Sequence, residues 1–256
     1  MAWNPLQYER YEALRWRPAR DLVEALPELA PGTVADLGCG TGRLARLLAE
    51  RYSGAAVSGI DSSPEMLAKA RGVASRVTWV QADVAAWRPA EPLDLCVSNA
   101  ALHWVGGHDR LFPALVGLLA PGGVLAVQMP CNEDAPSHAL LRALCAEPAW
   151  AGRLAALGSV RRVARPEDYY RWLRPHVSYA DLWTTAYLQP LVGPDPVLEW
   201  IKGTTLVPIL DRLDGEDRDR FLAALADRLR TAYPAEPDGT VLFPFSRLFV
   251  VARKPG

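Results

Sequence analysis

The stretch that decides the fold is Val34-Ala35-Asp36-Leu37-Gly38-Cys39-Gly40-Thr41-Gly42. The apolar run at its start predicts a short buried strand, and the residues from Arg43 to Tyr52 predict a helix of about three turns. The three glycines carry no Cβ, so the backbone between strand and helix can take left-handed angles and lie directly against a bound molecule. The first N–H groups of the helix would point to the same place, which favours a carboxylate or a phosphate there.

The spacing of the glycines indicates which kind of ligand fits. It is GxGxG, whereas a turn that binds a pyrophosphate has GxGxxG. Asp36 comes just before the turn, at the predicted carboxyl end of the strand, where its carboxylate can meet an amine. A ligand that carries both a carboxylate and an ammonium group therefore suits this turn better than a dinucleotide.

Two further acidic residues follow predicted strands. Asp61 lies twenty-three positions after Gly38 and closes the apolar run 55–60, and Asp83 follows the run 77–82. An acidic residue at the end of the second strand is where a ribose diol is bound, at the carboxyl edge of an open α/β sheet. Each aspartate alone is more typical of a helix cap or a turn. The three together, beside the glycine turn, predict a nucleoside site.

Four motifs follow one another along the chain: Asp36–Gly42, Gly59–Met66, Ala82-Asp83 and Ser98–Trp104. In order and in spacing they resemble the motifs of the class I S-adenosylmethionine-dependent methyltransferases. The resemblance implies an α/β, Rossmann-like fold, with a seven-stranded, mostly parallel sheet, an antiparallel last strand, helices on both faces and helical cap insertions. It also implies S-adenosyl-L-methionine as cofactor and S-adenosyl-L-homocysteine as product. The cofactor-binding residues that it implies are Asp36, Gly38, Gly40, Asp61, Ser62, Met66, Asp83, Val84 and Asn99.

Outside these motifs the chain resembles the trans-aconitate 2-methyltransferase family within this class. The resemblance is carried by Trp3-Asn4-Pro5, Arg15 to Pro18, Val127 to Pro130, Trp183 to Tyr187 and Arg247 to Arg253. It implies O-methylation of one carboxylate of trans-aconitate or of a similar di- or tricarboxylate. The substrate-binding residues predicted on this basis are Trp3, Tyr8, Arg17, His103, Trp104, Lys202 and Arg247.

The chemistry of a carboxylate acceptor agrees with this prediction. A carboxyl group with an ordinary pKa near ~4 is ionised at neutral pH and needs no general base to attack a sulfonium methyl group. The enzyme then has to align and desolvate the reactants, which can supply about 7–11 kcal/mol. The carboxylates that do not react need cations and hydrogen-bond donors, and His103 would position the substrate.

Two other functions are compatible with the same motifs. The first is a C- or O-methyltransferase that acts on another small metabolite, with His103 as its general base. The second is a nucleotide-binding module without catalysis. Two of the candidate cations also have structural explanations, since Lys202 is typical of a solvated helix end and Arg247 of an ion pair at a strand edge.

The expected domain organisation follows from the motifs and from the helical patterns around them. Residues 1–30 would form a lid over the cofactor or a surface helix over the sheet edge, with Pro18 in the first turn of a helix. Residues 31–130 would form the cofactor-binding core, with a turn at Gly122-Gly123. The segments 131–178 and 189–240 would form a helical cap, in which residues 152–158 show no clear pattern. The segments 179–188 and 241–256 would supply the last strands of the sheet.

Composition restricts the class of protein further. Among 256 residues, 28 are basic and 29 are acidic, so a nucleic-acid partner is disfavoured. No run reaches ~18 apolar residues, so no membrane span is expected. The four cysteines and four histidines lack metal-binding spacing, which predicts no metal and reduced thiols in a cytoplasmic protein. The oligomeric state is left open.

Overall fold

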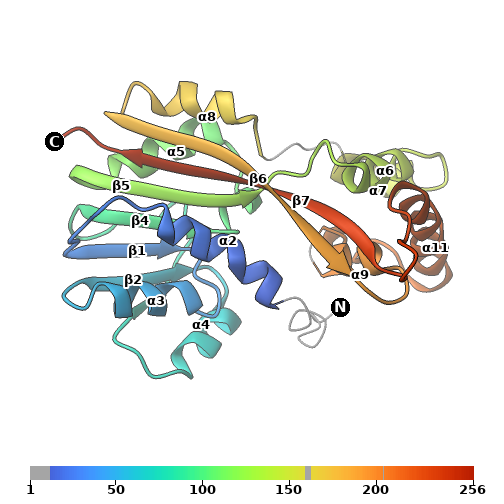
Figure 1. Cartoon of the computed structure of the whole chain (residues 1–256), viewed down its shortest axis with the longest axis horizontal. Coiled ribbons are helices and arrows are strands. Elements are labelled where there is room, and N and C mark those ends of the chain that lie inside the picture. Colours follow the sequence, from blue (N-terminus) through green and yellow to red (C-terminus); the bar gives the residue numbers. More distant parts are fainter. Residues whose placement is uncertain (1–11, 159–162, 204) are drawn as a thin grey trace. The chain divides into compact units, whose positions relative to one another are not determined.

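The computed structural model describes residues 12–158, 163–203 and 205–256 (Figure 1). The chain divides into two compact units. The unit that we call the sheet unit comprises Arg17–Cys131, Arg162–Thr185 and Arg247–Gly256. The other, which we call the helical unit, comprises Met1–Trp16, Asn132–Arg161 and Ala186–Ser246.

A seven-stranded sheet runs in the order β3-β2-β1-β4-β5-β7-β6. The first five strands pair in parallel, and β7 is antiparallel to β5. The parallel strands are apolar on both faces because helices cover both sides, so β1 is buried almost throughout. The predicted fold class is therefore confirmed. The strands are β1 (Thr33–Leu37), β2 (Ala56–Asp61), β3 (Thr78–Gln81), β4 (Leu93–Asn99), β5 (Leu119–Pro130), β6 (Tyr179–Leu191) and β7 (Val241–Arg253).

Local sequence signals explain where several helices around the sheet begin. Ser63 is the N-cap of α4, and its hydroxyl accepts a hydrogen bond from the Met66 N–H at 3.3 Å, with Pro64 at the first helical position. Proline likewise occupies the first turn of α8. The helices in this part of the chain are α2 (Glu12–Glu24), α3 (Arg43–Arg51), α4 (Pro64–Arg71), the 3₁₀ turn η1 (Leu102–Trp104), α5 (His108–Gly117) and α8 (Pro166–Leu173).

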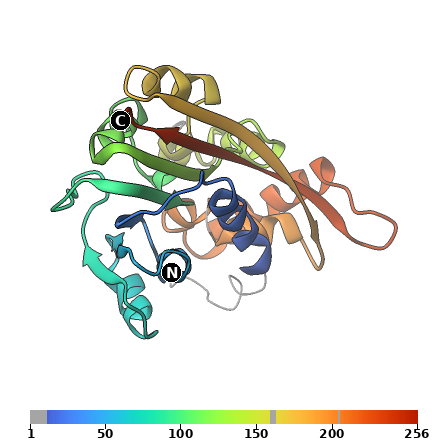
Figure 2. The same cartoon turned by 60° about the vertical axis from the view of Figure 1, so that its left-hand side comes forward.

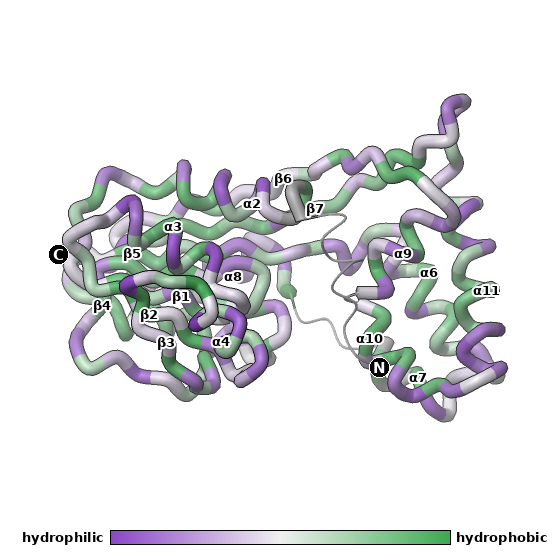
Figure 3. Tube along the Cα trace, turned by 90° about the horizontal axis from the view of Figure 1, so that it is seen from below, coloured by the Kyte–Doolittle hydropathy of each residue, from purple (hydrophilic) through white to green (hydrophobic). Residues whose placement is uncertain are grey.

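The helical unit contains five helices among its described residues, and the helices bury one face each. Figure 3 shows hydrophobic and hydrophilic residues alternating along α11, and the buried face of that helix includes Phe221, Leu225 and Leu229. Phe221 packs edge-on against Trp150, with ring centroids 5.3 Å apart. The helices are α6 (Pro136–Cys145), α7 (Ala151–Gly158), α9 (Pro196–Lys202), α10 (Val207–Leu210) and α11 (Gly215–Ala232).

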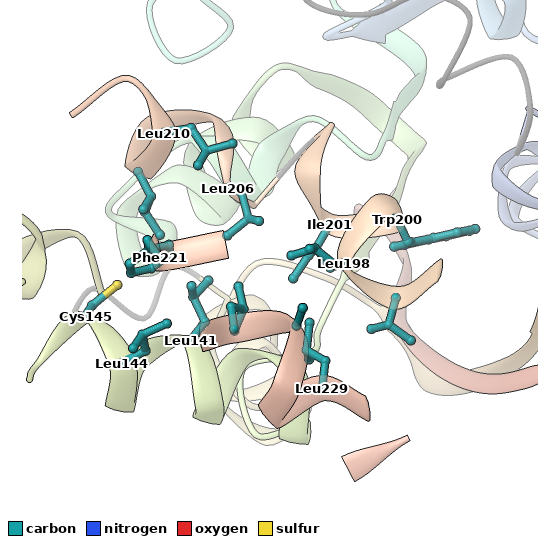
Figure 4. Packing of buried hydrophobic residues seen from close by; sticks show 14 of the residues in the cluster. Leu141, Leu144, Cys145, Leu198, Trp200, Ile201, Leu206, Leu210, Phe221 and Leu229 are labelled. Carbon is teal, nitrogen blue, oxygen red and sulfur yellow. The ribbon is translucent and has the colours of Figure 1, made fainter. Parts of the chain in front are cut away.

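Each unit has a hydrophobic core of its own. In the sheet unit, alternate residues of the strands, such as Leu37 and Val127, pack with Phe112 of α5 and Tyr169 of α8. In the helical unit the core joins α6, α7, α9, α10 and α11, as Figure 4 shows in close-up. Figures 1 and 2 show β6 and β7 as two long neighbouring strands, and each strand belongs in part to both units. No described helix has the length and apolar character that crossing a membrane requires.

The structure corrects several predicted element boundaries. Pro18 lies inside α2 and not in its first turn, because the helix already begins at Glu12. The turn expected at Gly122-Gly123 lies within β5 as a bulge, since β4 residues Leu93 and Leu95 pair with Leu119 and Val124. The segment 152–158, which shows no clear pattern in the sequence, is part of α7. The helix α8, expected in the cap segment, groups with the sheet unit.

Candidate active site

The glycine turn between β1 and α3 is attached to the end of β2 by its own amides. Gly38 N–H and Cys39 N–H both donate to the carbonyl oxygen of Ile60, at 2.7 and 3.0 Å. Gly40 N–H donates to Oδ2 of Asp61 at 2.8 Å. These three amides are therefore paired within the protein and are not open to an anionic ligand. They hold the turn at the carboxyl edge of the sheet instead.

The three glycines of the turn have different roles, although all take left-handed angles, with φ of +74°, +53° and +79°. A Cβ on Gly38 would lie 2.1 Å from the Cβ of Ala101, and one on Gly42 would lie 2.2 Å from Cη2 of Trp79. A Cβ on Gly40 would meet no described atom outside its neighbours within 4 Å. Gly38 and Gly42 thus permit close packing within the protein, whereas Gly40 leaves backbone exposed where a ligand can approach.

Asp61 joins the two loops that border the candidate site. Its Oδ2 accepts the Gly40 N–H, and its Oδ1 accepts the N–H of Ser63 at the start of α4, at 2.8 Å. The side chain is half-buried at the end of β2. Each carboxylate oxygen has a second lone pair, so the fixed carboxylate retains the capacity to accept hydrogen bonds from ligand hydroxyl groups.

Asp36 is buried in β1, and its carboxylate is directed to the first turn of α3. Burial raises the pKa of this carboxyl group to about 7. A hydrogen bond from the Ala45 N–H lowers the pKa, and the negative charge on Asp61 raises it. Its Oδ2 has no hydrogen-bond partner among the described residues. One oxygen thus stabilises the helix start, and the other is left for a ligand.

The remaining cofactor candidates lie at the same edge of the sheet. Asp83 is exposed after β3 and forms a turn, with Oδ1 accepting the Ala85 N–H at 2.9 Å. Asn99 ends β4, and its Oδ1 is buried without a partner among the described residues. The others are Ser62, which is exposed, and Met66 and Val84, which are half-buried.

His103 and Trp104 lie together in the turn η1, just after β4. Their ring centroids are 4.8 Å apart, and the Trp104 residue is 50 % exposed. A buried network that the sequence analysis did not identify fixes this turn. His108 Nε2 lies 2.9 Å from the carbonyl oxygen of Leu102, and His108 Nδ1 lies 2.5 Å from the hydroxyl of Tyr169.

The proton positions in this network follow from its partners. The carbonyl oxygen of Leu102 can only accept, so Nε2 of His108 carries a proton; in the neutral imidazole, Nδ1 then accepts from the Tyr169 hydroxyl. The same hydroxyl accepts the Ala164 N–H at 3.2 Å. His108 and Tyr169 lie 61 positions apart, and no local sequence signal connects them.

The other predicted substrate residues occupy different parts of the chain. Arg247 is buried in β7, and Arg17 is exposed in α2, with Nε 4.0 Å from Oδ2 of Asp21. Lys202 belongs to the helical unit, and its Nζ lies 2.5 Å from Oε1 of Glu199. Trp3 and Tyr8 lie outside the described residues. Within the described ranges, no group of three or more potential metal ligands occurs.

Comparison with known proteins decides the family. Residues 34–123 match the model of a methyltransferase domain. The trans-aconitate 2-methyltransferase of Methylobacterium nodulans is 47% identical over 253 residues, which cover 98% of each chain. The enzyme of the same name from Streptomyces avermitilis is 47% identical over 262 residues, which cover 99% of this chain and 97% of that one. This chain belongs to the trans-aconitate 2-methyltransferase family.

Membership of the trans-aconitate 2-methyltransferase family makes the protein an S-adenosylmethionine-dependent methyltransferase. Comparison with solved structures supports the fold. The phosphoethanolamine N-methyltransferase 2 of Haemonchus contortus, in complex with S-adenosyl-L-methionine, superimposes with a TM-score of 0.54 at 18% identity. The match covers 94% of this chain and 53% of that one. The described site fits the cofactor, because Gly40 leaves backbone open and because Asp36 and Asn99 each have a buried acceptor oxygen without a partner among the described residues.

Proposed function

We propose that this protein transfers the methyl group of S-adenosylmethionine to a carboxylate oxygen of trans-aconitate or of a closely similar di- or tricarboxylate. The observation that carries the proposal is the identity of 47% over almost the whole length of two relatives of that name. The identity includes the segments outside the methyltransferase domain, where acceptor specificity is determined in a fold that serves many substrates. The relatives do not favour the alternative in which His103 is a general base.

For the cofactor, we propose contacts with the residues at the carboxyl edge of the sheet. Asp61 would accept hydrogen bonds from the ribose hydroxyls, and Gly40 would allow the cofactor to lie against the backbone. Asp36 and Asn99 would supply acceptor oxygens to its ammonium group. When bound, the cofactor supplies an electrophilic methyl group on a sulfonium. Ser62, Met66, Asp83, Val84 and Gly38 complete the proposed cofactor site.

For the acceptor, we propose that the protein positions an ionised carboxylate and does not remove a proton. A carboxylate is already the nucleophile at neutral pH, so the residues that surround it need to orient it and to exclude water. His103 and Arg247 would serve as hydrogen-bonding and cationic partners of the acceptor. Trp3, Tyr8, Arg17, Trp104 and Lys202 complete the proposed substrate set.

A methyl-transfer assay tests the proposed function. The protein is incubated with methyl-labelled S-adenosylmethionine and a panel of small di- and tricarboxylic acids that includes trans-aconitate. A methyl ester releases its label as methanol in alkali, whereas an ether or a C-methyl product retains it. We expect alkali-labile label with trans-aconitate or a near relative. Alkali-stable label, or no product from any acid although S-adenosylhomocysteine binds, would contradict the proposal. An Asp61→Ala variant, which should bind the cofactor poorly, provides the background.

We also propose that the enzyme works in the cytoplasm on a small molecule and has no nucleic-acid partner. The nearly equal numbers of basic and acidic residues, 28 and 29, support the second part, since they create no strong attraction for a polyanion. Cys39, Cys96 and Cys145 are buried with free thiols, which suits a reducing compartment. Fractionation of cells that express the protein would test the location.

A further inference from the structure

Gln128 stands out in the sheet unit as a buried amide whose side chain makes no hydrogen bond to the described residues. The residue lies in β5 and is 0% exposed, and neither Oε1 nor Nε2 has a hydrogen-bond partner among the described residues. Buried polar side chains almost always have a partner in a native structure. Both ends of this amide therefore have unused hydrogen-bonding capacity among the described residues.

A second amide projects from the neighbouring strand. Asn99 of β4 pairs with Gln128 of β5 in the parallel register, so the two side chains project from the same face of the sheet. Asn99 also has a buried oxygen, Oδ1, without a partner in the described part of the chain. The two amides thus form one polar patch at the carboxyl ends of β4 and β5.

The next strand adds a cation and an apolar flank to this face. In β7, Phe249 pairs with Gln128 and Arg247 pairs with Pro130, so Arg247 projects from the same face two residues further along. Arg247 is only 8% exposed. Trp183 of β6 stacks on Phe249, with ring centroids 4.8 Å apart and planes 5° apart. The amides and the guanidinium therefore lie in a largely desolvated setting.

Charge is segregated along the carboxyl edge of the sheet. The aspartates Asp36 and Asp61 lie on β1 and β2, whereas Gln128 and Arg247 lie on β5 and β7, beyond β4 in the sheet order. An adenosyl sulfonium cation suits the acidic side. A carboxylate suits the side with the guanidinium and the amide donors, because hydrogen bonds to ionised groups are the strong ones in such surroundings.

We infer that Gln128 positions the methyl acceptor, with its amide Nε2 donating a hydrogen bond to an acceptor carboxylate beside Asn99 and Arg247. The inference rests on the proposed function and adds a residue to it that the sequence analysis did not select. The orientation of the amide follows from the carboxylate, which can only accept hydrogen bonds.

The test compares Gln128→Leu with the wild-type enzyme in three measurements: kcat and KM for trans-aconitate, the Kd of S-adenosylhomocysteine, and the Tm of the unliganded protein. We expect kcat/KM to fall about 10- to 100-fold, as for the loss of one hydrogen bond to a charged group, while Kd stays within about twofold. We expect Tm to rise, because leucine removes a buried amide that has no hydrogen-bond partner in the described part of the chain. Gln128→Glu, which places a negative charge beside the acceptor, should lower kcat/KM further.

Ser98→Ala is the matched control, because Ser98 is equally buried in β4 but its hydroxyl already donates to the carbonyl of Leu37 at 2.7 Å. This variant should lower Tm and leave kcat/KM for the acceptor unchanged. Three results would overturn the inference: unchanged kcat/KM in Gln128→Leu, a loss confined to cofactor affinity, or a lower Tm with unchanged kinetics, which would indicate a structural amide bound to buried water. A wild-type enzyme that is inactive overturns the proposed function and this inference together. A wild-type enzyme that is active, with an unchanged kcat/KM in the Gln128→Leu variant, overturns the inference alone.

Discussion

Asp36 combines a structural contact with a protonation state that depends on pH near neutrality. The pKa of its carboxyl group is raised to about 7 by burial, whereas the same group in an unfolded chain has a pKa of 3.8. The folded protein therefore keeps this proton over a range of pH in which the unfolded chain has already released it. The stabilisation is complete below about pH 4 and is lost as the pH rises through about 7.

We predict that Asp36→Asn, a neutral isostere, responds differently to pH. The difference in unfolding free energy between the variant and the wild-type protein should grow in favour of the variant from about pH 4 to about pH 7. Its upper bound is on the order of 4 kcal/mol, from about 1.4 kcal/mol for each unit of pKa shift. Urea unfolding of both proteins at a series of pH values measures the difference, because groups common to both proteins cancel. A difference that does not vary with pH would contradict the raised pKa.

At the residue scale, the sequence predicts best where a signal is local. Ser63 as N-cap and Asp61 at the end of β2 follow from residues within a few positions. The burial of the Gln128 amide does not follow from nearby residues, because it depends on β4 and β7, which are distant in sequence. The contact of Asp36 with the first turn of α3 agrees with the tendency of a single aspartate to cap a helix.

At the scale of elements, the glycine turn yields a matched pair of variants. In Gly38→Ala the new Cβ would lie 2.1 Å from the Cβ of Ala101, on a backbone with φ of +74°. We predict a loss of stability of about 2–5 kcal/mol from steric conflict and left-handed strain together. In Gly40→Ala the space is open, so only the strain of about 1–2 kcal/mol remains.

We also predict an effect of Gly40→Ala on cofactor binding. The added methyl group of Gly40→Ala would occupy the open side of the turn, so the affinity for S-adenosylhomocysteine should fall although folding is nearly preserved. Urea unfolding and calorimetric titration of both variants measure the two effects. Equal losses of stability, or full cofactor affinity in Gly40→Ala, would show that the assignment of roles within the turn is incorrect.

Element boundaries show where sequence patterns are insufficient. Gly122-Gly123 reads as a turn before a strand, and Gly122 does take a left-handed φ of +76°. The strand nevertheless continues through it, because Leu119 already pairs with Leu93 and the Gly122 N–H donates to the carbonyl of Pro255. A contact with the end of the chain, 133 positions away, thus converts a predicted turn into a bulge.

At the scale of the whole molecule, the two separate cores predict that the units respond independently to core mutations. Phe221 is fully buried in the core of the helical unit, and Phe112 is fully buried in that of the sheet unit. Replacement of either residue by alanine should cost about 3–5 kcal/mol. We predict that Phe221→Ala accelerates amide hydrogen exchange in α6, α7 and α11 and leaves β1, β4 and β5 protected.

Phe112→Ala should produce the reverse pattern, and bound S-adenosylhomocysteine should restore protection to the sheet unit of this variant. Exchange followed by mass spectrometry resolves the two sets of peptides. If both variants accelerated exchange uniformly, the two cores would unfold as one cooperative unit, contrary to the prediction.

The sequence also has limits at this scale. The motifs predict the parallel core, and the resemblance predicts the antiparallel last strand, which pairs β7 with β5. The assignment of α8 to the sheet unit was not predicted. Tyr169 of that helix contacts His108 and Phe112 of α5, with its ring centroid 4.7 Å from that of Phe112, and such packing leaves no periodic signal in the segment 131–178.

The order of the strands has a consequence for the protein while it is being synthesised. β7 lies between β5 and β6, although it leaves the ribosome after both of them. Until residues Val241–Arg253 emerge, the nascent chain has an unpaired edge on β5, and β6 lacks its neighbour in the described sheet. Exposed strand edges invite pairing with other chains. A chain that stops before Val241 would therefore be aggregation-prone, even though every residue of the glycine turn had already been translated.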